Sequence, residues 1–203
     1  TEDIRSSRSM NPLPLHHVWD YRDVDCAFWR EHLEGWLPAR LIDAHTHVMH
    51  PRFRRAPMTE AMRRQYWVNE VLEPIDAVTA DRCLRTVLPG RAVTCVAFGI
   101  PDLDFDLDAG NAWLAEACAE RGWHSLAVIR PQWTQSDTVR LLDRPGVIGL
   151  KPYYSLISSH RETRDAHLEA SVFDFLPHHI LEVANDRGAW VTLHVPKAAR
   201  LGH

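Results

Sequence analysis

Two histidines separated by a single residue, His45 and His47, are the first candidates for chemistry in this sequence. They stand at the end of a strand-like segment, residues 40–45, with the sequence RLIDAH. Residues i and i+2 of a strand point to the same side, so both imidazoles can meet at one point. Imidazole nitrogens bind Zn²⁺ and related cations at about 2.0–2.1 Å. An H-x-H pair arises easily by chance in a chain with 13 histidines, but its place at a strand end favours a metal site.

Two further residues extend this candidate site. Asp43 stands two residues before His45 and has the same parity in the strand, so it either orients a ligand ring or is a hydrogen-bonded structural residue. The structural role is slightly favoured. His194 ends another strand-like segment, residues 189–194. An isolated histidine at a strand end is more often hydrogen-bonded than metal-bound, but the repeated strand-end location favours a third ligand.

Lys151 directly follows the apolar segment 146–150 (GVIGL), where it shares a face with Val147 and Gly149. A lysine at the end of a buried strand must reach solvent or find a partner, because an unpaired buried charge is costly. It could pair with a substrate carboxylate, balance a ligand carboxylate, or be carboxylated and bridge two metal ions. The alternative is a lysine whose stem packs on apolar side chains while its amine stays in water. Lys151 is the candidate catalytic residue.

Four more side chains follow the predicted strands and are candidates for substrate binding: Arg130, Tyr153, Tyr154 and His160. Arg130 ends the third strand, and its guanidinium could clamp a carboxylate. An ordinary loop role is at least as well favoured for all four.

The elements that must position these residues alternate between strands and helices. Helices are predicted at residues 23–36, 59–88 with a break near Pro74, 108–121, 136–142 and 174–187. Ser136 is the predicted N-cap of the fourth helix, and Gly122 and Gly188 close the third and fifth. Strands are predicted at residues 40–45, 92–98, 124–129, 146–150 and 189–194.

Strands rich in Val, Ile and Leu that alternate with helices indicate parallel βαβ units. Two architectures have this order, a doubly wound sheet and a (β/α)₈ barrel. The pattern alone does not choose between them, but neither G-x-G-x-x-G after the first strand nor G-x-x-x-x-G-K-[ST] occurs, so a nucleotide-binding sheet lacks its usual support. The chain divides into an N-terminal leader and helix, residues 1–39, and a barrel portion, residues 40–203.

Composition excludes several classes of function. The formal net charge of −4 gives no general attraction to nucleic acid or anionic membrane. No apolar run approaches the roughly 20 residues that a transmembrane helix needs, and residues 1–14 lack the apolar core of a signal peptide. The cysteines form no C-x-x-C pair, so we expect free or buried thiols and a cytoplasmic protein. The expected partner is a small-molecule substrate.

With these residues in view, the chain resembles the amidohydrolase superfamily, and most closely its amidohydrolase 2 branch of decarboxylases and hydrolases of small carboxylated or lactone substrates. The resemblance rests on L-I-D-A-H-T-H in the first strand, the lysine that ends the fourth and the histidine that ends the fifth. It implies a (β/α)₈ TIM barrel, zinc or another divalent metal held by His45, His47 and His194, and Lys151 as a bridge in two-metal branches. The implied function is a metal-dependent hydrolase that uses a metal-activated water. A decarboxylase or hydratase, and an inactive fragment with a structural or interaction role, are the alternatives.

The same resemblance implies ligands that have no counterpart here. The family's strand-six histidine and strand-eight aspartate are absent from the five predicted strands, and a full barrel takes about 250 residues. We therefore expect a truncated chain with about five of the eight strands, which alone binds metal weakly and catalyses little. Unpaired edges of the first and fifth strands and an uncovered apolar face predict poor solubility or a homo-oligomer.

Overall fold

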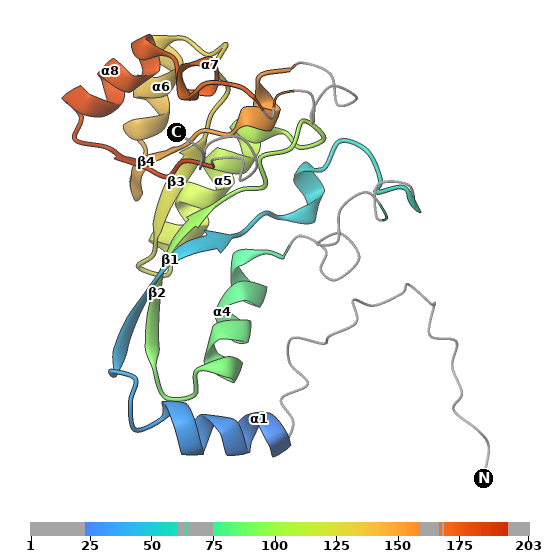
Figure 1. The fold of residues 1–203 in the computed structure, drawn as a ribbon, viewed down its shortest axis with the longest axis vertical. Helices are drawn as coiled ribbons and strands as arrows, with labels where there is room; N and C mark the ends of the chain where they lie inside the picture. Colours follow the sequence, from blue (N-terminus) through green and yellow to red (C-terminus); the bar gives the residue numbers. More distant parts are fainter. Residues whose placement is uncertain (1–22, 61–63, 65–74, 159–166, 168, 195–203) are drawn as a thin grey trace.

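Five parallel strands form one curled sheet and pair in the order β1-β2-β3-β4-β5 (Figure 1). The structure is a computed structural model that describes residues 23–60, 64, 75–158, 167 and 169–194. At least one helix lies between each pair of consecutive strands, which confirms the α/β class expected from the sequence. The strands are β1 (Arg40–His47), β2 (Ala92–Phe98), β3 (His124–Val128), β4 (Val147–Lys151) and β5 (Trp190–Val191).

The α-helices lie in the regions predicted from the sequence, but several begin or end at other residues. The predicted helix at residues 23–36 is present as a short α-helix continued by a π-helical turn. Of the predicted helix at 59–88, residues 61–63 and 65–74 lie outside the described residues, and a helix is present at its C-terminal end. The described helices are α1 (Asp23–Phe28), the π-helical turn (Trp29–Leu33), α4 (Ala77–Val87), α5 (Leu107–Ala119), α6 (Gln135–Leu142), α7 (Val172–Phe175) and α8 (His178–Asp186), with short 3-10 helices at Pro51–Phe53 and Tyr154–Leu156.

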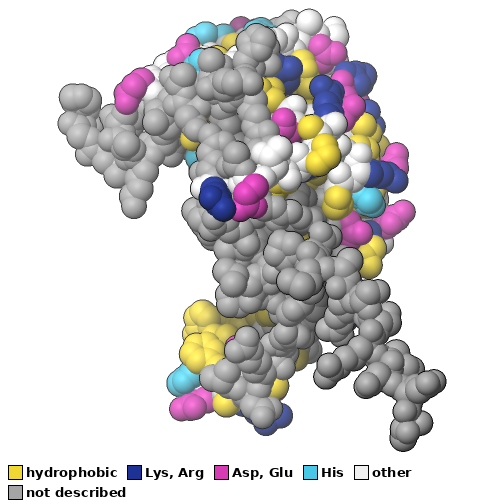
Figure 2. Space-filling view, turned by 90° about the vertical axis from the view of Figure 1, so that its right-hand side faces the viewer, with side chains coloured by type: hydrophobic (Ala, Val, Ile, Leu, Met, Phe, Trp, Pro, Cys, Tyr) yellow, Lys and Arg dark blue, Asp and Glu magenta, His cyan; other side chains and the backbone are white. Residues whose placement is uncertain are grey.

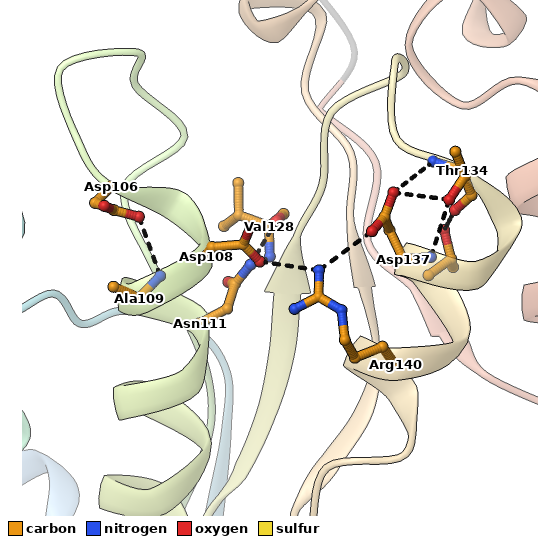
Figure 3. Close-up of polar contacts among 9 residues, drawn as sticks. Asp106, Asp108, Ala109, Asn111, Val128, Thr134, Asp137 and Arg140 are labelled. Carbon is orange, nitrogen blue, oxygen red and sulfur yellow. Dashed lines mark hydrogen bonds and ion pairs between the residues drawn. The ribbon is translucent and has the colours of Figure 1, made fainter.

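Helix α6 begins one residue earlier than predicted, because Thr134 and not Ser136 is its N-cap. The Thr134 hydroxyl accepts the backbone N–H of Asp137, and the Asp137 carboxylate accepts the backbone N–H of Thr134 (Figure 3). This capping box satisfies two N–H groups that a helix start otherwise leaves unpaired. Arg140 then joins Asp137, at 3.2 Å, to Asp108 of α5, at 3.5 Å, so the cap also ties two neighbouring helices together.

The single helix predicted at residues 174–187 is two helices, α7 and α8, and that prediction was wrong. The break is at Leu176–Pro177, where Leu176 has the non-helical angles φ −131° and ψ 75°. A residue before proline is disfavoured in helical geometry, and proline itself has no N–H to donate. The second helix still ends at Gly188, which has a φ of +58° that suits glycine.

Apolar side chains divide between the two faces of the sheet. On the outer face, Cys95 and Ala97 of β2 pack against α4 and α5. On the other face, Phe98, Leu126 and Val128 pack with side chains from the segments that follow β2 and β4. We call the second face the inner face, because the sheet curls around it (Figure 1).

A β-bulge interrupts β1 beside the histidine pair. Asp43 pairs with Cys95 and Thr46 with Ala97, so one extra residue of β1 opposes β2 between them. Inside the bulge, the backbone N–H of His45 donates to the Asp43 carboxylate at 2.9 Å. Cys95 belongs to the outer face, so its partner Asp43 does too. The shared parity predicted for Asp43 and His45 is therefore wrong, and Asp43 has the structural role.

The edge strands leave large apolar side chains exposed on the inner face. Ile42 of β1 is 75% exposed and Trp190 of β5 is 59% exposed. Strand β5 has two residues instead of the predicted six, and the last ladder hydrogen bond beyond it runs from the Thr192 N–H to the Leu150 carbonyl. The sheet is thus an open half-barrel, which is compatible with a partial TIM-like fold.

Three further features of the molecule concern the cellular environment predicted from the sequence. Figure 2 shows hydrophobic side chains gathered at the end of the molecule that carries α1. Phe28 at the end of α1 and Trp36 beyond the π-helical turn are both exposed. Over the described residues, helices long and apolar enough for a bilayer are absent. All of the chain's cysteines are free thiols, as predicted, with Cys95 and Cys118 buried.

Candidate metal centre

His45 and His47 lie next to each other at the C-terminal end of β1. Their ring centroids are 5.5 Å apart, with an angle of 61° between the ring planes. His47 pairs in register with Phe98, so its side chain faces the inner side of the sheet, and His45 follows the same alternation. Both residues retain exposed surface. Two accessible imidazoles at one strand end can bind a divalent cation together.

A backbone hydrogen bond sets the tautomer of His47. Its Nδ1 lies 3.2 Å from the carbonyl oxygen of Gly99, the residue after β2. A carbonyl oxygen only accepts, so Nδ1 carries the proton and Nε2 keeps its lone pair. Metal-binding histidines are commonly oriented in this way, with one ring nitrogen donating to a carbonyl and the other left for the metal.

The three candidate ligands are neutral imidazoles at physiological pH. Burial lowers the pKa of His47 to about 4, and the hydrogen bond to Gly99 only partly opposes this. The pKa values of His45 and His194 are also lowered, first by burial and then by the positive charge of Lys151. Charges on His45, Lys151 and His194 all act on His47, so the four groups share one electrostatic environment. Neutral imidazole is the form that binds metal.

Lys151 is buried at the end of β4, with 1% of its surface exposed. It pairs in register with Val128, so its side chain lies on the inner face. Because this side chain is buried, the alternative of a lysine that reaches solvent is wrong. Its Nζ lies 4.6 Å from the ring centroid of Phe98 and 5.9 Å from that of Tyr153, and it makes no hydrogen bond within the described part of the chain. Burial lowers the pKa of this amine to about 8.

His194 lies three residues beyond the end of β5 and not within a strand. Its ring stacks on Tyr153, with centroids 4.0 Å apart and an interplanar angle of 20°, and more distantly on Tyr154, at 5.4 Å. In residues 23–60, 75–158 and 169–194, no three His, Cys, Asp or Glu side chains are grouped closely enough to hold a metal ion. The structure brings together the two histidines of β1. The role of His194 as a third ligand stays a prediction.

The predicted substrate-binding residues separate into three groups. Tyr153 and Tyr154 stack with each other and with His194 at the mouth of the sheet. Arg130 donates a hydrogen bond to the Ser158 carbonyl at 3.4 Å. Together with Arg55 and Trp133 it lines a small cavity of about 140 Å³, and none of the candidate metal ligands lines this cavity. His160 lies outside the described residues.

Two residues of the site were missed in the sequence. Phe98 contacts both histidines of β1, and Gly99 supplies the carbonyl that orients His47. The position of Phe98 in the sequence could have indicated its place in the site. Phe98 ends the predicted strand at residues 92–98, and this strand follows the strand that carries the histidine pair. A larger groove lies between α6 and α8, but it is lined by residues of those helices and contains none of the candidate ligands.

No family model matches the chain, and no curated protein matches its sequence. What the chain does must therefore be argued from the residues at the strand ends.

Proposed function

We propose that this chain is a metal-dependent hydrolase of the amidohydrolase type, in which His45, His47 and His194 hold zinc or another divalent cation. The observation that carries the proposal is the pair of neutral imidazoles at the end of β1, with the Nδ1 proton of His47 donated to Gly99. A buried amine in the same electrostatic environment adds to it. Ionisable groups with displaced pKa values at the C-terminal ends of parallel strands are typical of active sites.

The proposed fold is a TIM barrel, of which the described sheet forms five strands. Strands β1 to β5 pair in sequential order, with helices in every connection, as in a barrel of this type. A closed barrel has eight strands. Ile42 and Trp190, exposed at the two edges, would then face the barrel interior.

The donor set fits a divalent cation through His45 and His47, and His194 would complete it after leaving Tyr153. A bound zinc ion would supply Lewis acidity for a substrate carbonyl and for an attacking water. The chain's own contribution begins with His47, whose hydrogen bond to Gly99 holds the ring in one tautomer. The aromatic rings around Lys151 exclude water from its amine.

Lys151 has two roles available, because its pKa of about 8 leaves both forms present near neutral pH. The neutral amine accepts a proton, and the ammonium binds an anion. No carboxylate in the described residues pairs with its Nζ. This favours a substrate that brings its own carboxylate, so a metal-dependent decarboxylase or hydratase is the second candidate function.

Metal content tests the proposal directly. The 203-residue chain should bind zinc weakly, at about one ion per chain, when binding is measured by equilibrium dialysis with elemental analysis. The variant His47→Asn should bind almost none. His124→Asn is the matched control, because His124 is an exposed histidine at the opposite end of strand β3. Equal zinc in all three proteins would refute the metal site and leave a structural or interaction role.

Substrate tests then separate the two reactions. Lactones and activated esters with a free carboxylate report hydrolysis, and β-keto acids and aromatic carboxylates that lose CO₂ report decarboxylation. Each assay is run with and without zinc, because the proposal requires that the reaction depend on the metal.

A further inference from the structure

One aromatic side chain contacts three members of the candidate site. Phe98, the last residue of β2, is fully buried. Its ring centroid lies 4.8 Å from that of His45 and 4.5 Å from that of His47, at interplanar angles of 84° and 78°. The Nζ of Lys151 lies over the same ring, 4.6 Å from its centroid. Phe98 thereby links two residues of β1 to one of β4.

The perpendicular contacts restrict the two imidazoles without using their nitrogens. Edge-to-face packing is a preferred arrangement of aromatic rings, and it limits how each imidazole can turn. A phenyl ring has no carbonyl or carboxylate, so it occupies no ring nitrogen of His45 or His47, and Nε2 of His47 stays available for a metal. The residue after Phe98 completes the orientation, since the Gly99 carbonyl accepts the Nδ1 proton of His47.

The contact with Lys151 has a different consequence. The face of an aromatic ring attracts an ammonium weakly and offers no proton acceptor. Phe98 fills the space beneath the amine, where water would otherwise solvate it, and the amine makes no hydrogen bond within the described residues. A smaller or non-aromatic side chain would admit water and stabilise the charged form.

We propose that Phe98 is a positioning residue of this site, which orients His45 and His47 for metal and keeps the Lys151 amine out of water. The part that concerns metal rests on the proposed function, whereas the part that concerns the amine does not. Phe98 thus acts through the residues that it contacts and touches no substrate itself.

The test replaces Phe98 and a matched phenylalanine in the full chain. Phe98→Leu removes the ring and keeps an apolar side chain. Phe105→Leu is the control, because Phe105 is equally buried in the same inner cluster but packs under the Arg54 guanidinium. Zinc affinity, measured by competition with a chromophoric chelator, should fall about 10–100-fold in Phe98→Leu, the usual loss when an orienting partner is removed. Phe105→Leu should stay close to the wild type. If circular dichroism shows Phe98→Leu unfolded, Phe98→Met takes its place.

The second measurement is independent of metal. Competitive labelling with acetic anhydride, read for each peptide by mass spectrometry, gives the pH at which Lys151 becomes reactive. The midpoint should rise by about one pH unit or more in Phe98→Leu, toward that of an ordinary lysine, and stay in place in Phe105→Leu. Equal zinc affinity and equal midpoints in the two variants would overturn the inference. If the wild-type chain binds no zinc, the proposed function fails, and the labelling midpoint alone decides the role of Phe98.

Discussion

The two sides of the candidate site differ in how the backbone holds them. On the first side, β1 has eight residues and pairs with β2 at six positions, and both histidines belong to the strand. On the second side, β5 has two residues that pair with β4, and His194 follows three residues after its end. A ligand within a strand ladder is placed by the backbone, whereas a ligand beyond the ladder is placed only by what its side chain touches.

The contacts of the rings show the consequence. His47 donates to a backbone carbonyl and packs edge-on against Phe98, so its remaining nitrogen is available. His194 instead stacks flat on Tyr153. A binding site needs side chains that are already held in the productive geometry. The β1 side meets this requirement, and the β5 side would have to rearrange.

Replacing ligands one at a time should give the largest difference between the two sides. His47→Asn removes a preorganised ligand, and zinc affinity should fall by more than about 100-fold, beyond the loss typical of an orienting partner. His194→Asn should cost less than about 10-fold, because a ring stacked on Tyr153 contributes little until it turns. Chelator competition with both variants measures the ratio. Losses of equal size would show that His194 binds as firmly as His47.

The close approach of β4 and β5 can be broken at Gly149. A Cβ on this residue would lie 1.9 Å from the Trp190 carbonyl oxygen, and a backbone atom cannot move aside as a side chain can. Gly149→Ala should cost about 3 kcal/mol or more, the upper end of the range for overpacking, and lower Tm by roughly 6–12 °C.

Gly35→Ala is the control for this substitution, because a Cβ there meets no atom within 4 Å. It should change the free energy of unfolding by no more than about 0.5 kcal/mol. A Gly149→Ala protein with the Tm of the control would mean that β5 does not pack closely on β4.

Lys151 lies between the two sides of the site. Burial of its amine without a hydrogen-bond partner among the described residues should lower the free energy of unfolding. Lys151→Met replaces an amine without a hydrogen bond by an apolar side chain, so at pH 7.5 the variant should be more stable by about 1–3 kcal/mol. The pKa of Lys151 falls from 10.5 in the unfolded chain to about 8 in the folded one. The unfolded chain therefore binds more protons between these values, and wild-type stability falls as pH drops from 10.5 to 8.

The difference between Lys151→Met and the wild type should thus be largest at pH 8 and below and shrink as the pH approaches 10.5. Urea denaturation at pH 7.5 and 10.5 measures it. A variant that is less stable than the wild type at pH 7.5 would show that the amine has a stabilising partner.

The sequence was sufficient to locate the strands and to place the two histidines of β1 together at a strand end, for a physical reason. Val-, Ile- and Leu-rich segments such as 92–98 specify strands locally, and a histidine pair inside one inherits its alternation. The bulge at residues 43–46 could not be foreseen, because it depends on how β1 pairs with β2. Phe98 looked like an ordinary core residue for the same reason, since its importance comes from neighbours on other strands.

The β5 side was harder to predict, because the length of β5 is not determined by its own residues alone. Residues 189–194 have the composition of a strand, yet the ladder needs a neighbour along its whole length, and β4 ends at Lys151. The position of His194 is then decided by a stacking contact with a side chain distant in sequence. Composition and periodicity contain no information about such a contact.

The smallest expected effect concerns that stacking contact, and its sign opposes intuition. Tyr153→Leu removes the ring that holds His194, so His194 should turn toward His45 and His47 more easily and zinc affinity should rise. Aromatic pairs of this kind contribute about 0.5–1.5 kcal/mol, which corresponds to roughly a 2- to 12-fold gain. Tyr153→Phe keeps the stacked ring and should bind zinc as the wild type does. In the double variant Tyr153→Leu, His194→Asn, the gain should vanish, because no third imidazole remains to be released. A loss of affinity in Tyr153→Leu would show that the tyrosine holds His194 in its binding position, and the two sides of the site would then be equally well organised.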